Sequence, residues 1–188
     1  MATRRTETTQ ESRRLLVQAA GELFAEKGFR RTSFVEIAER AGISRGSIPW
    51  HFGNKLGLLE AVLEDRLQAM LAGFGPPEGA ADPLEQVMGF VRLPVTRLFI
   101  TLLGEAVEDG SPIREHYARL HAALRQGARA RMRSAALPAG VDPEAFTVLL
   151  VGAVIGVHAQ WRVAPEAVDL EAVRAVASAL LPQDLARH

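Results

Sequence analysis

A short stretch of the chain, between residues 44 and 55, gathers side chains that can bind nucleic acid. Its hydroxyl, guanidinium, indole, imidazole and ammonium groups are of the kinds that contact phosphate oxygens and base edges. They belong to Ser44, Arg45, Ser47, Trp50, His51 and Lys55. A guanidinium can pair with guanine through two hydrogen bonds, whereas an ammonium near a helix N-terminus adds salt-dependent affinity for phosphates. The stretch therefore favours a DNA-binding surface over an ordinary helical hairpin with a similar turn.

Two short helices joined by a glycine turn are expected to position these groups. The first opens with a capping box, in which Ser33 accepts from the Glu36 amide and Glu36 reaches back. Its apolar face consists of Phe34, Ile37, Ala38 and Ala41. Gly42 suits the left-handed turn, and Ser44 can cap the second helix. This arrangement predicts a helix-turn-helix.

The rest of the chain predicts helices throughout, because strand signals are scarce and Ala, Leu, Arg and Glu dominate. A disordered tail is expected over residues 1–9, although Arg4 and Arg5 could instead reach a DNA minor groove. The expected helices cover residues 11–27, the pair within 33–52, then 54–72, 83–93, 95–107, 112–136, 143–162 and 170–181.

These elements predict an all-α protein of about nine helices. A three-helix N-terminal module with the helix-turn-helix occupies residues 1–54, and an antiparallel helical bundle occupies residues 55–188. Glycine and proline at residues 73–81 form the strongest linker signal in the chain.

Charge is distributed unevenly although its sum is zero. Residues 1–55 hold ten Lys and Arg against six Asp and Glu, and the rest of the chain carries the compensating negative charge. A basic N-terminal module on an acidic body fits a protein that contacts phosphates at one end.

Composition also excludes several classes of site. The chain has no cysteine, which excludes disulfides, cysteine-based zinc sites and thiol redox chemistry. Its five histidines are scattered, and no His or Glu pair has the spacing of a metal or catalytic site. We therefore expect no cofactor, no metal and no enzymatic activity.

The segment from Ala145 to Trp161 carries no formal charge and lies at the short edge of what a membrane span needs. It also contains polar residues and two glycines, so a helix buried on all sides of a bundle is the preferred interpretation. The N-terminus lacks the apolar core of a signal peptide. We expect a cytoplasmic protein that does not bind a membrane.

The chain resembles the TetR family of bacterial transcriptional regulators, chiefly over residues 12–66. The resemblance is carried by the pattern from Thr32 to Ser44, by Gly46-Ser-Ile, by Trp50-His-Phe-Gly-Asn-Lys55 and by Leu58-Leu-Glu-Ala-Val62. Beyond residue 75 it is only architectural. It implies phosphate contacts at the start of the first helix of the pair, base contacts on the second, and backbone contacts after it. The implied DNA-binding residues are Thr32, Ser33, Ser44, Arg45, Gly46, Ser47, Trp50, His51 and Lys55. The alternatives to DNA contacts by these two residues are that Trp50 packs in the core and that His51 is buried.

Pro49 departs from the family pattern, which usually has tyrosine there. Proline lacks the amide that would bond the Arg45 carbonyl, and its ring would crowd that carbonyl. We therefore predict a loosened first turn, a regular helix that starts nearer Ser47, and an altered direction of Arg45.

The resemblance further implies a homodimer built from the last two long helices, a double-stranded palindromic operator and a small-molecule effector. An apolar helix with Gly152 and Gly156 four residues apart supports such a dimer. The expected interface comprises Phe146, Leu149, Gly152, Gly156, Val173 and Ala177. The expected lining of a mostly apolar pocket is Phe90, Phe99, Leu102, Leu103, Tyr117, Leu120, His121, His158 and Trp161, with ordinary core packing as the alternative for each. A ligand-released repressor is the preferred function, and an activator or a ligand-independent regulator is the alternative.

Overall fold

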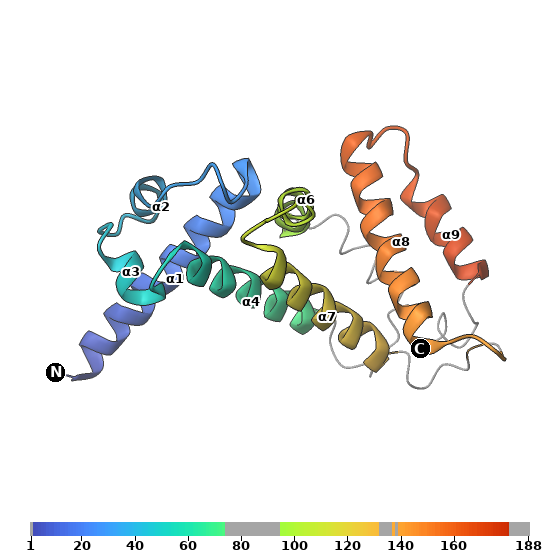
Figure 1. Cartoon of the computed structure of the whole chain (residues 1–188), viewed down its shortest axis with the longest axis horizontal. Helices are drawn as coiled ribbons and strands as arrows, with labels where there is room; N and C mark the ends of the chain where they lie inside the picture. Colours follow the sequence, from blue (N-terminus) through green and yellow to red (C-terminus); the bar gives the residue numbers. More distant parts are fainter. Residues whose placement is uncertain (1, 74–94, 132–136, 138, 181–188) are drawn as a thin grey trace. The chain divides into compact units, whose positions relative to one another are not determined.

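The computed structural model describes residues 2–73, 95–131, 137 and 139–180, and all regular structure within them is helical (Figure 1). The helices are α1 (Ala2–Lys27), α2 (Phe34–Ala41), α3 (Ser47–Phe52), α4 (Lys55–Gly73), α6 (Val95–Ala106), α7 (Arg114–Arg131), α8 (Pro143–Val163) and α9 (Leu170–Leu180). The expected all-α class is confirmed. The helix expected at 83–93 and the expected ends at residues 136 and 181 lie outside the described residues.

Local capping signals begin three of these helices, α4, α8 and α9, as the sequence predicts. Asn54 Oδ1 accepts from the Gly57 amide at 3.0 Å, and Asp142 Oδ2 accepts from the Ala145 amide at 2.8 Å. Asp169 Oδ1 likewise accepts from the amides of the first turn of α9. Each carboxylate or amide oxygen satisfies a backbone donor that lacks a partner within its own helix.

The N-terminal tail corrects the sequence analysis. Helix α1 begins at Ala2, so the disordered tail expected over residues 1–9 is wrong. Residues 2–10 contain neither glycine nor proline, and each residue added to an existing helix gains a backbone hydrogen bond. The ion pair of Glu11 with Arg14, at 2.6 Å, supports the turn from which this extension starts.

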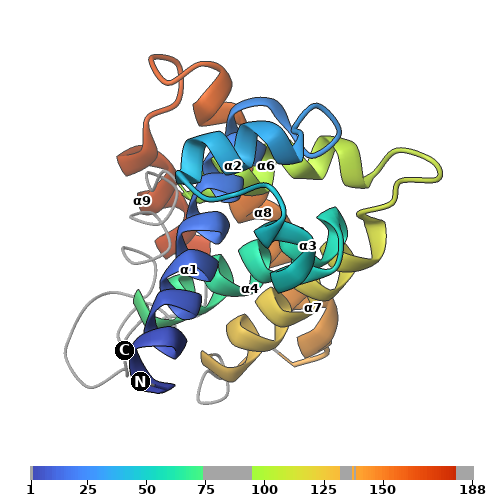
Figure 2. The same ribbon diagram turned by 90° about the vertical axis from the view of Figure 1, so that its left-hand side faces the viewer.

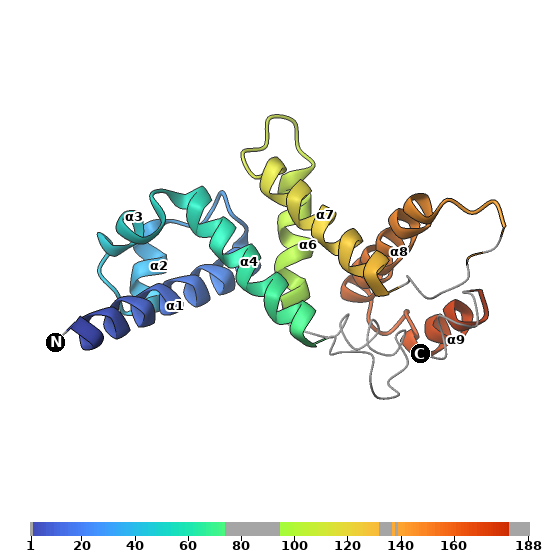
Figure 3. The same cartoon turned by 90° about the horizontal axis from the view of Figure 1, so that it is seen from below.

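The first of two compact units contains α1 to α4, α6 and the first part of α7. Helices α2 and α3 both pack against α1 (Figure 3). Helix α4 crosses α1 (Figure 2), and a side-chain carbon at Gly21 would lie 3.4 Å from Val62 of α4. The core of the unit is apolar and includes Leu16, Phe24, Ile37, Ile48, Leu58, Leu59 and Leu102. This core anchors both helices of the helix-turn-helix through Ile37 and Ile48.

The second unit contains the rest of α7 together with α8 and α9. Helices α8 and α9 run antiparallel and are joined by residues 164–169 (Figure 1). The two units are groups of residues that contact one another more than they contact the rest of the chain. The domain boundary expected between residues 54 and 55 stays a prediction.

Helix α8 gives a second correction. It was expected to be buried on all sides, but Leu149 and Val163 are 69% and 86% exposed. Its buried polar residues, Thr147 and His158, are three helical turns apart and therefore share one face. By length and composition alone, α8 is the one helix in the described ranges that would suffice to cross a membrane. Apolar residues therefore occupy more of the circumference of α8 than the rest of this chain buries.

Candidate nucleic-acid interface

The turn before α3 has the shape that Pro49 was expected to impose. The amides of Ser47 and Ile48 donate to the carbonyls of Ser44 and Arg45, at 3.0 and 3.3 Å. This three-residue spacing is that of a tight turn, and the regular helix starts only at Ser47. Pro49 is then the third residue of α3, where the helix requires no amide donor. The loosened first turn is confirmed.

The cap of α3 differs from the expected one. Gly46, not Ser44, is the residue that precedes the helix, and it makes no side-chain cap. The Ser44 hydroxyl instead lies 2.9 Å from the Ser47 hydroxyl, across the same tight turn. The amides of Ser47 and Ile48, the first two of the helix, are bonded to the carbonyls of Ser44 and Arg45 and not to the Ser44 hydroxyl.

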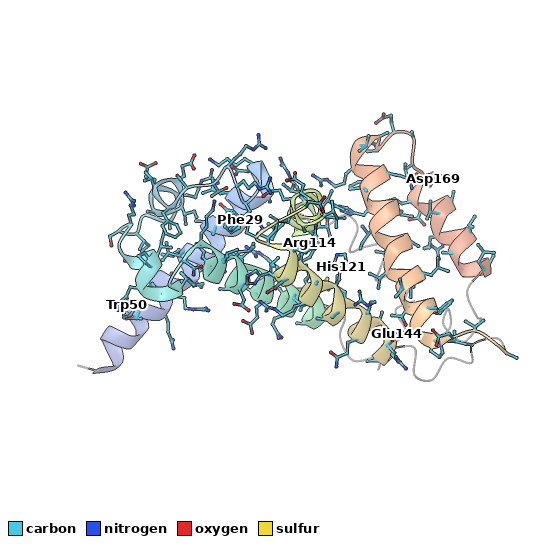
Figure 4. All side chains as sticks on the ribbon, in the orientation of Figure 1. Phe29, Trp50, Arg114, His121, Glu144 and Asp169 are labelled. Carbon is cyan, nitrogen blue, oxygen red and sulfur yellow. The ribbon has the colours of Figure 1, made fainter. Side chains whose placement is uncertain are left out.

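The outer face of the turn and of α3 carries the groups expected to contact bases. Ser44, Arg45 and Gly46 are exposed, and Ser47 is half-buried. On the inner face, Ile48 is completely buried and anchors the helix in the core. The side chain of Trp50 is 70% exposed (Figure 4), which excludes the alternative that the indole serves core packing.

His51 lies beside Trp50, and the two rings meet edge to face with centroids 4.5 Å apart. Burial lowers the pKa of His51, and the positive charge of Arg13 lowers it further. Arg13 comes from α1, and its guanidinium carbon lies 5.4 Å from the centre of the Phe52 ring. Sequence reasoning missed Arg13, because no local pattern connects α1 to the end of α3.

Lys55, the first residue of α4, is half-buried in a cage made by the loop of residues 28–33. Its ammonium lies 4.4 Å from the centre of the Phe29 ring and donates to the Arg30 carbonyl at 3.4 Å. Burial lowers the pKa of Lys55, and the negative charges of Glu105 and Glu36 act in the opposite direction. An ammonium held at a helix N-terminus is suited to a phosphate contact.

Gly57 allows α4 to start this close to the end of α3. A side-chain carbon at Gly57 would lie 2.2 Å from the Phe52 carbonyl oxygen, a distance that no substituted residue tolerates. The glycine therefore fixes the spacing between α3 and Lys55.

Thr32 corrects one expected contact. Its side chain is 2% exposed, and its hydroxyl donates to the Gly28 carbonyl at 2.7 Å. The hydroxyl therefore closes the loop between α1 and α2 and is not presented to a phosphate. Ser33 is exposed, and its hydroxyl forms the expected capping box with Glu36.

Glu36 also joins α2 to α1 through an ion pair with Lys27. That hydrogen bond, together with those from the Ser33 amide and hydroxyl, lowers the pKa of Glu36 to about 2. Glu36 stays ionised at neutral pH, so the pair holds the two helices in register beneath the turn.

The residues expected to line a ligand pocket are distributed over both units. Leu102, Tyr117 and Leu120 are buried in the first unit, with Phe99 and Leu103 half-buried there. The Tyr117 hydroxyl donates to the Phe99 carbonyl, which joins α7 to α6. His121, His158 and Trp161 belong to the second unit, and Phe90 lies outside the described residues. The pocket stays a prediction.

The residues expected at a dimer interface lie on α8 and α9. Leu149 and Gly152 are exposed, and Phe146, Gly156, Val173 and Ala177 are half-buried. The space next to Gly152 and Gly156 is open, because a side-chain carbon at either position would meet nothing within 4 Å. In the part of the chain that the structure describes, no cluster of His, Asp and Glu could hold a metal ion.

Comparison with known proteins agrees with this geometry. Residues 16–62 match the family described as bacterial regulatory proteins of the tetR family. The HTH-type transcriptional regulator TtgR of Pseudomonas putida is 29% identical over 191 residues, which cover 90% of this chain and 89% of TtgR.

Two solved structures show the same fold. Salmonella enterica GusR has a TM-score of 0.75 at 24% identity and covers 90% of this chain and 95% of its own. FadR from Bacillus subtilis, solved in complex with stearoyl-CoA, has a TM-score of 0.64 at 18% identity. The match covers 92% of this chain and 96% of the FadR chain.

The matched family and the full-length relative regulate transcription, so the expectation that the chain is not an enzyme is confirmed. The match over residues 16–62 contains the capping box, the glycine turn and α3. Over residues 16–62 the chain therefore carries the helix-turn-helix region of the tetR family, and over most of its length it is similar to an HTH-type transcriptional regulator.

Proposed function

We propose that the chain is a homodimeric, cytoplasmic repressor that binds a palindromic operator and leaves it when a small, mostly apolar ligand binds the C-terminal region. The observation that carries the DNA-binding part is the exposed face of α3. Arg45 and Trp50 point away from the core while Ile48 anchors the helix. In this proposal Arg45 reads base edges in the major groove, and Trp50, His51 and Lys55 contact the DNA backbone.

The exposed apolar surface of α8 and α9 supports dimerisation. Val148 and Leu149 on α8 are 52% and 69% exposed, and Val176 and Leu180 on α9 are 58% and 79% exposed. Exposed apolar side chains on two consecutive helices favour a surface that a partner covers. A second copy would cover it symmetrically and would place two α3 helices about one DNA turn apart.

The ligand part of the proposal depends on the apolar composition of the C-terminal helices and on the relatives. FadR holds stearoyl-CoA, a molecule with a long apolar chain. The side chains of α6 and α8 are likewise mostly apolar, with few polar groups among them. A ligand-induced loss of operator affinity needs a coupling free energy of about 1–3 kcal/mol.

The first experiment identifies the operator by a genome-wide pull-down and measures affinity by fluorescence anisotropy with the recovered duplex. Light scattering on the purified protein and on the complex gives the number of copies. The same titration, repeated with long-chain acyl compounds and with apolar aromatic compounds, tests release. A Kd that no compound changes favours the ligand-independent alternative, and reporter expression that falls on deletion of the gene favours an activator.

A further inference from the structure

The backbone of Arg30 is held from two sides by different helices. Its amide donates to the Glu105 carboxylate of α6 at 3.1 Å, and its carbonyl accepts from the Lys55 ammonium of α4 at 3.4 Å. Glu105 is thus connected to Lys55 through a single residue of the loop 28–33. All three residues belong to the same compact unit.

The approach of Glu105 to this loop requires a glycine. Gly28 has a φ of +85°, and a side-chain carbon there would lie 2.0 Å from the other carboxylate oxygen of Glu105. A second bond, from the Thr101 hydroxyl to the Ala25 carbonyl at 3.2 Å, fastens the same face of α6 to the end of α1. The loop and α6 are therefore built to fit one another.

We propose that Glu105 is a positioning residue for DNA binding: it fixes the loop 28–33 and thereby holds the Lys55 ammonium where a DNA phosphate meets it. The proposal rests on the proposed role of Lys55 as a DNA contact. Glu105 itself lies on α6 and touches no DNA in this scheme. Its carboxylate acts chiefly by its hydrogen bond to the Arg30 amide, beside the weaker effect of its negative charge on the pKa of Lys55.

Charge and hydrogen bonding can be separated at this position. Glu105→Asp keeps the charge but shortens the side chain by one methylene, so its oxygens no longer reach the Arg30 amide. Glu105→Gln removes the charge but keeps an oxygen acceptor at the same place. We expect Glu105→Asp to weaken binding about fivefold and Glu105→Gln to stay within twofold of the wild type. A purely electrostatic effect on DNA instead predicts that Glu105→Gln binds more tightly than the wild type and that Glu105→Asp is unchanged, because only glutamine removes a negative charge near the phosphates.

Glu108 supplies a matched control. Its carboxylate contacts the same residue, but it pairs with the Arg30 side chain and not with the backbone. Glu108→Gln therefore removes a neighbouring charge and leaves the Arg30 amide bonded to Glu105. We expect its affinity to stay within twofold of the wild type, because exposed ion pairs contribute little.

A double-mutant cycle with Lys55→Ala tests whether Glu105 acts through Lys55. Affinities are measured by fluorescence anisotropy at about 0.15 M salt, with a duplex selected from a random pool by the wild-type protein. In the Lys55→Ala background, Glu105→Asp should change affinity less than twofold. Circular dichroism verifies that each variant is folded. If Glu105→Asp unfolds, Thr101→Val takes its place, with a smaller expected loss of DNA affinity.

The outcomes are distinct. Equal affinities of the aspartate and glutamine variants, or a fivefold loss that persists in the Lys55→Ala background, would overturn the positioning role while leaving DNA binding intact. A wild-type protein that selects no duplex would instead contradict the proposed function itself.

Discussion

Replacement of Trp50 by alanine separates DNA binding from folding. In the free protein the Trp50 side chain is 70% exposed, so about 60 Å² of a ~200 Å² aromatic side chain is covered. At about 25 cal/mol per Å², that contact stabilises the fold by about 1.5 kcal/mol. If DNA covers half of the exposed remainder, about 70 Å² more is buried, which corresponds to roughly a twentyfold loss of affinity on truncation.

Ile48→Ala is the matched comparison on the same helix. Ile48 is completely buried, and truncation of a buried isoleucine costs about 2–5 kcal/mol of folding free energy. Urea unfolding followed by circular dichroism measures the free energy of unfolding, and anisotropy with the operator duplex measures affinity. Trp50→Ala should lose more affinity than stability, and Ile48→Ala the reverse.

One combination of results would refute the assignment of Trp50 to DNA binding. If Trp50→Ala lowers the free energy of unfolding by 3 kcal/mol or more and leaves operator affinity unchanged, the indole is a packing residue and its exposure has been misinterpreted. The direction in which α3 faces DNA would then need to be reassigned.

Three further changes test other parts of the molecule. Arg13, whose guanidinium lies over the Phe52 ring at the end of α3, is expected to contact a DNA phosphate. Arg13→Ala should therefore reduce the slope of log affinity against log salt by about one, and an unchanged slope would contradict that contact. The same change should raise the pKa of His51, measured by NMR, because a positive charge beside the imidazole is lost. Glu36 has a pKa of about 2 in the folded chain against an ordinary value of 4.5, so its contribution to stability is present above about pH 4.5 and is lost as the pH falls towards 2. Acid unfolding of Glu36→Gln should lack that part of the pH dependence, and identical acid profiles would be evidence against the Lys27 pair. Leu149→Asp, which places a charge on the exposed face of α8, should yield a monomer by light scattering and lower the affinity for a two-half-site operator, whereas a dimer that persists would locate the interface elsewhere.

The parts of the fold that sequence predicts best are those set by neighbouring residues. The capping box of Ser33 and Glu36 depends on residues three apart, and it is present as expected. Gly42 takes the expected left-handed conformation with a φ of +65°. The late start of α3 was also predictable, because it follows from an amide that proline lacks.

The contacts that sequence could not predict join residues far apart in the chain. Arg13 meets Phe52 only because α1 packs on α3, and Glu105 meets Arg30 only because α6 packs against the loop 28–33. Thr32 was expected at a phosphate because its position matches a family pattern, but its hydroxyl is used inside the loop. Side-chain direction in a loop depends on tertiary packing, which a local pattern does not encode.

The tight turn before α3 has a consequence for base recognition. In an α-helix that began at Arg45, the Arg45 carbonyl would accept from residue 49, and successive side chains would advance by about 100°. Here that carbonyl accepts from the Ile48 amide, in the three-residue spacing that advances side chains by about 120°. Over the two residues from Arg45 to Ser47 the difference accumulates to roughly 40°. We therefore expect Arg45 to meet a different base from the one that a tyrosine-bearing relative would contact, while Lys55, held by its own cage, keeps the same phosphate position.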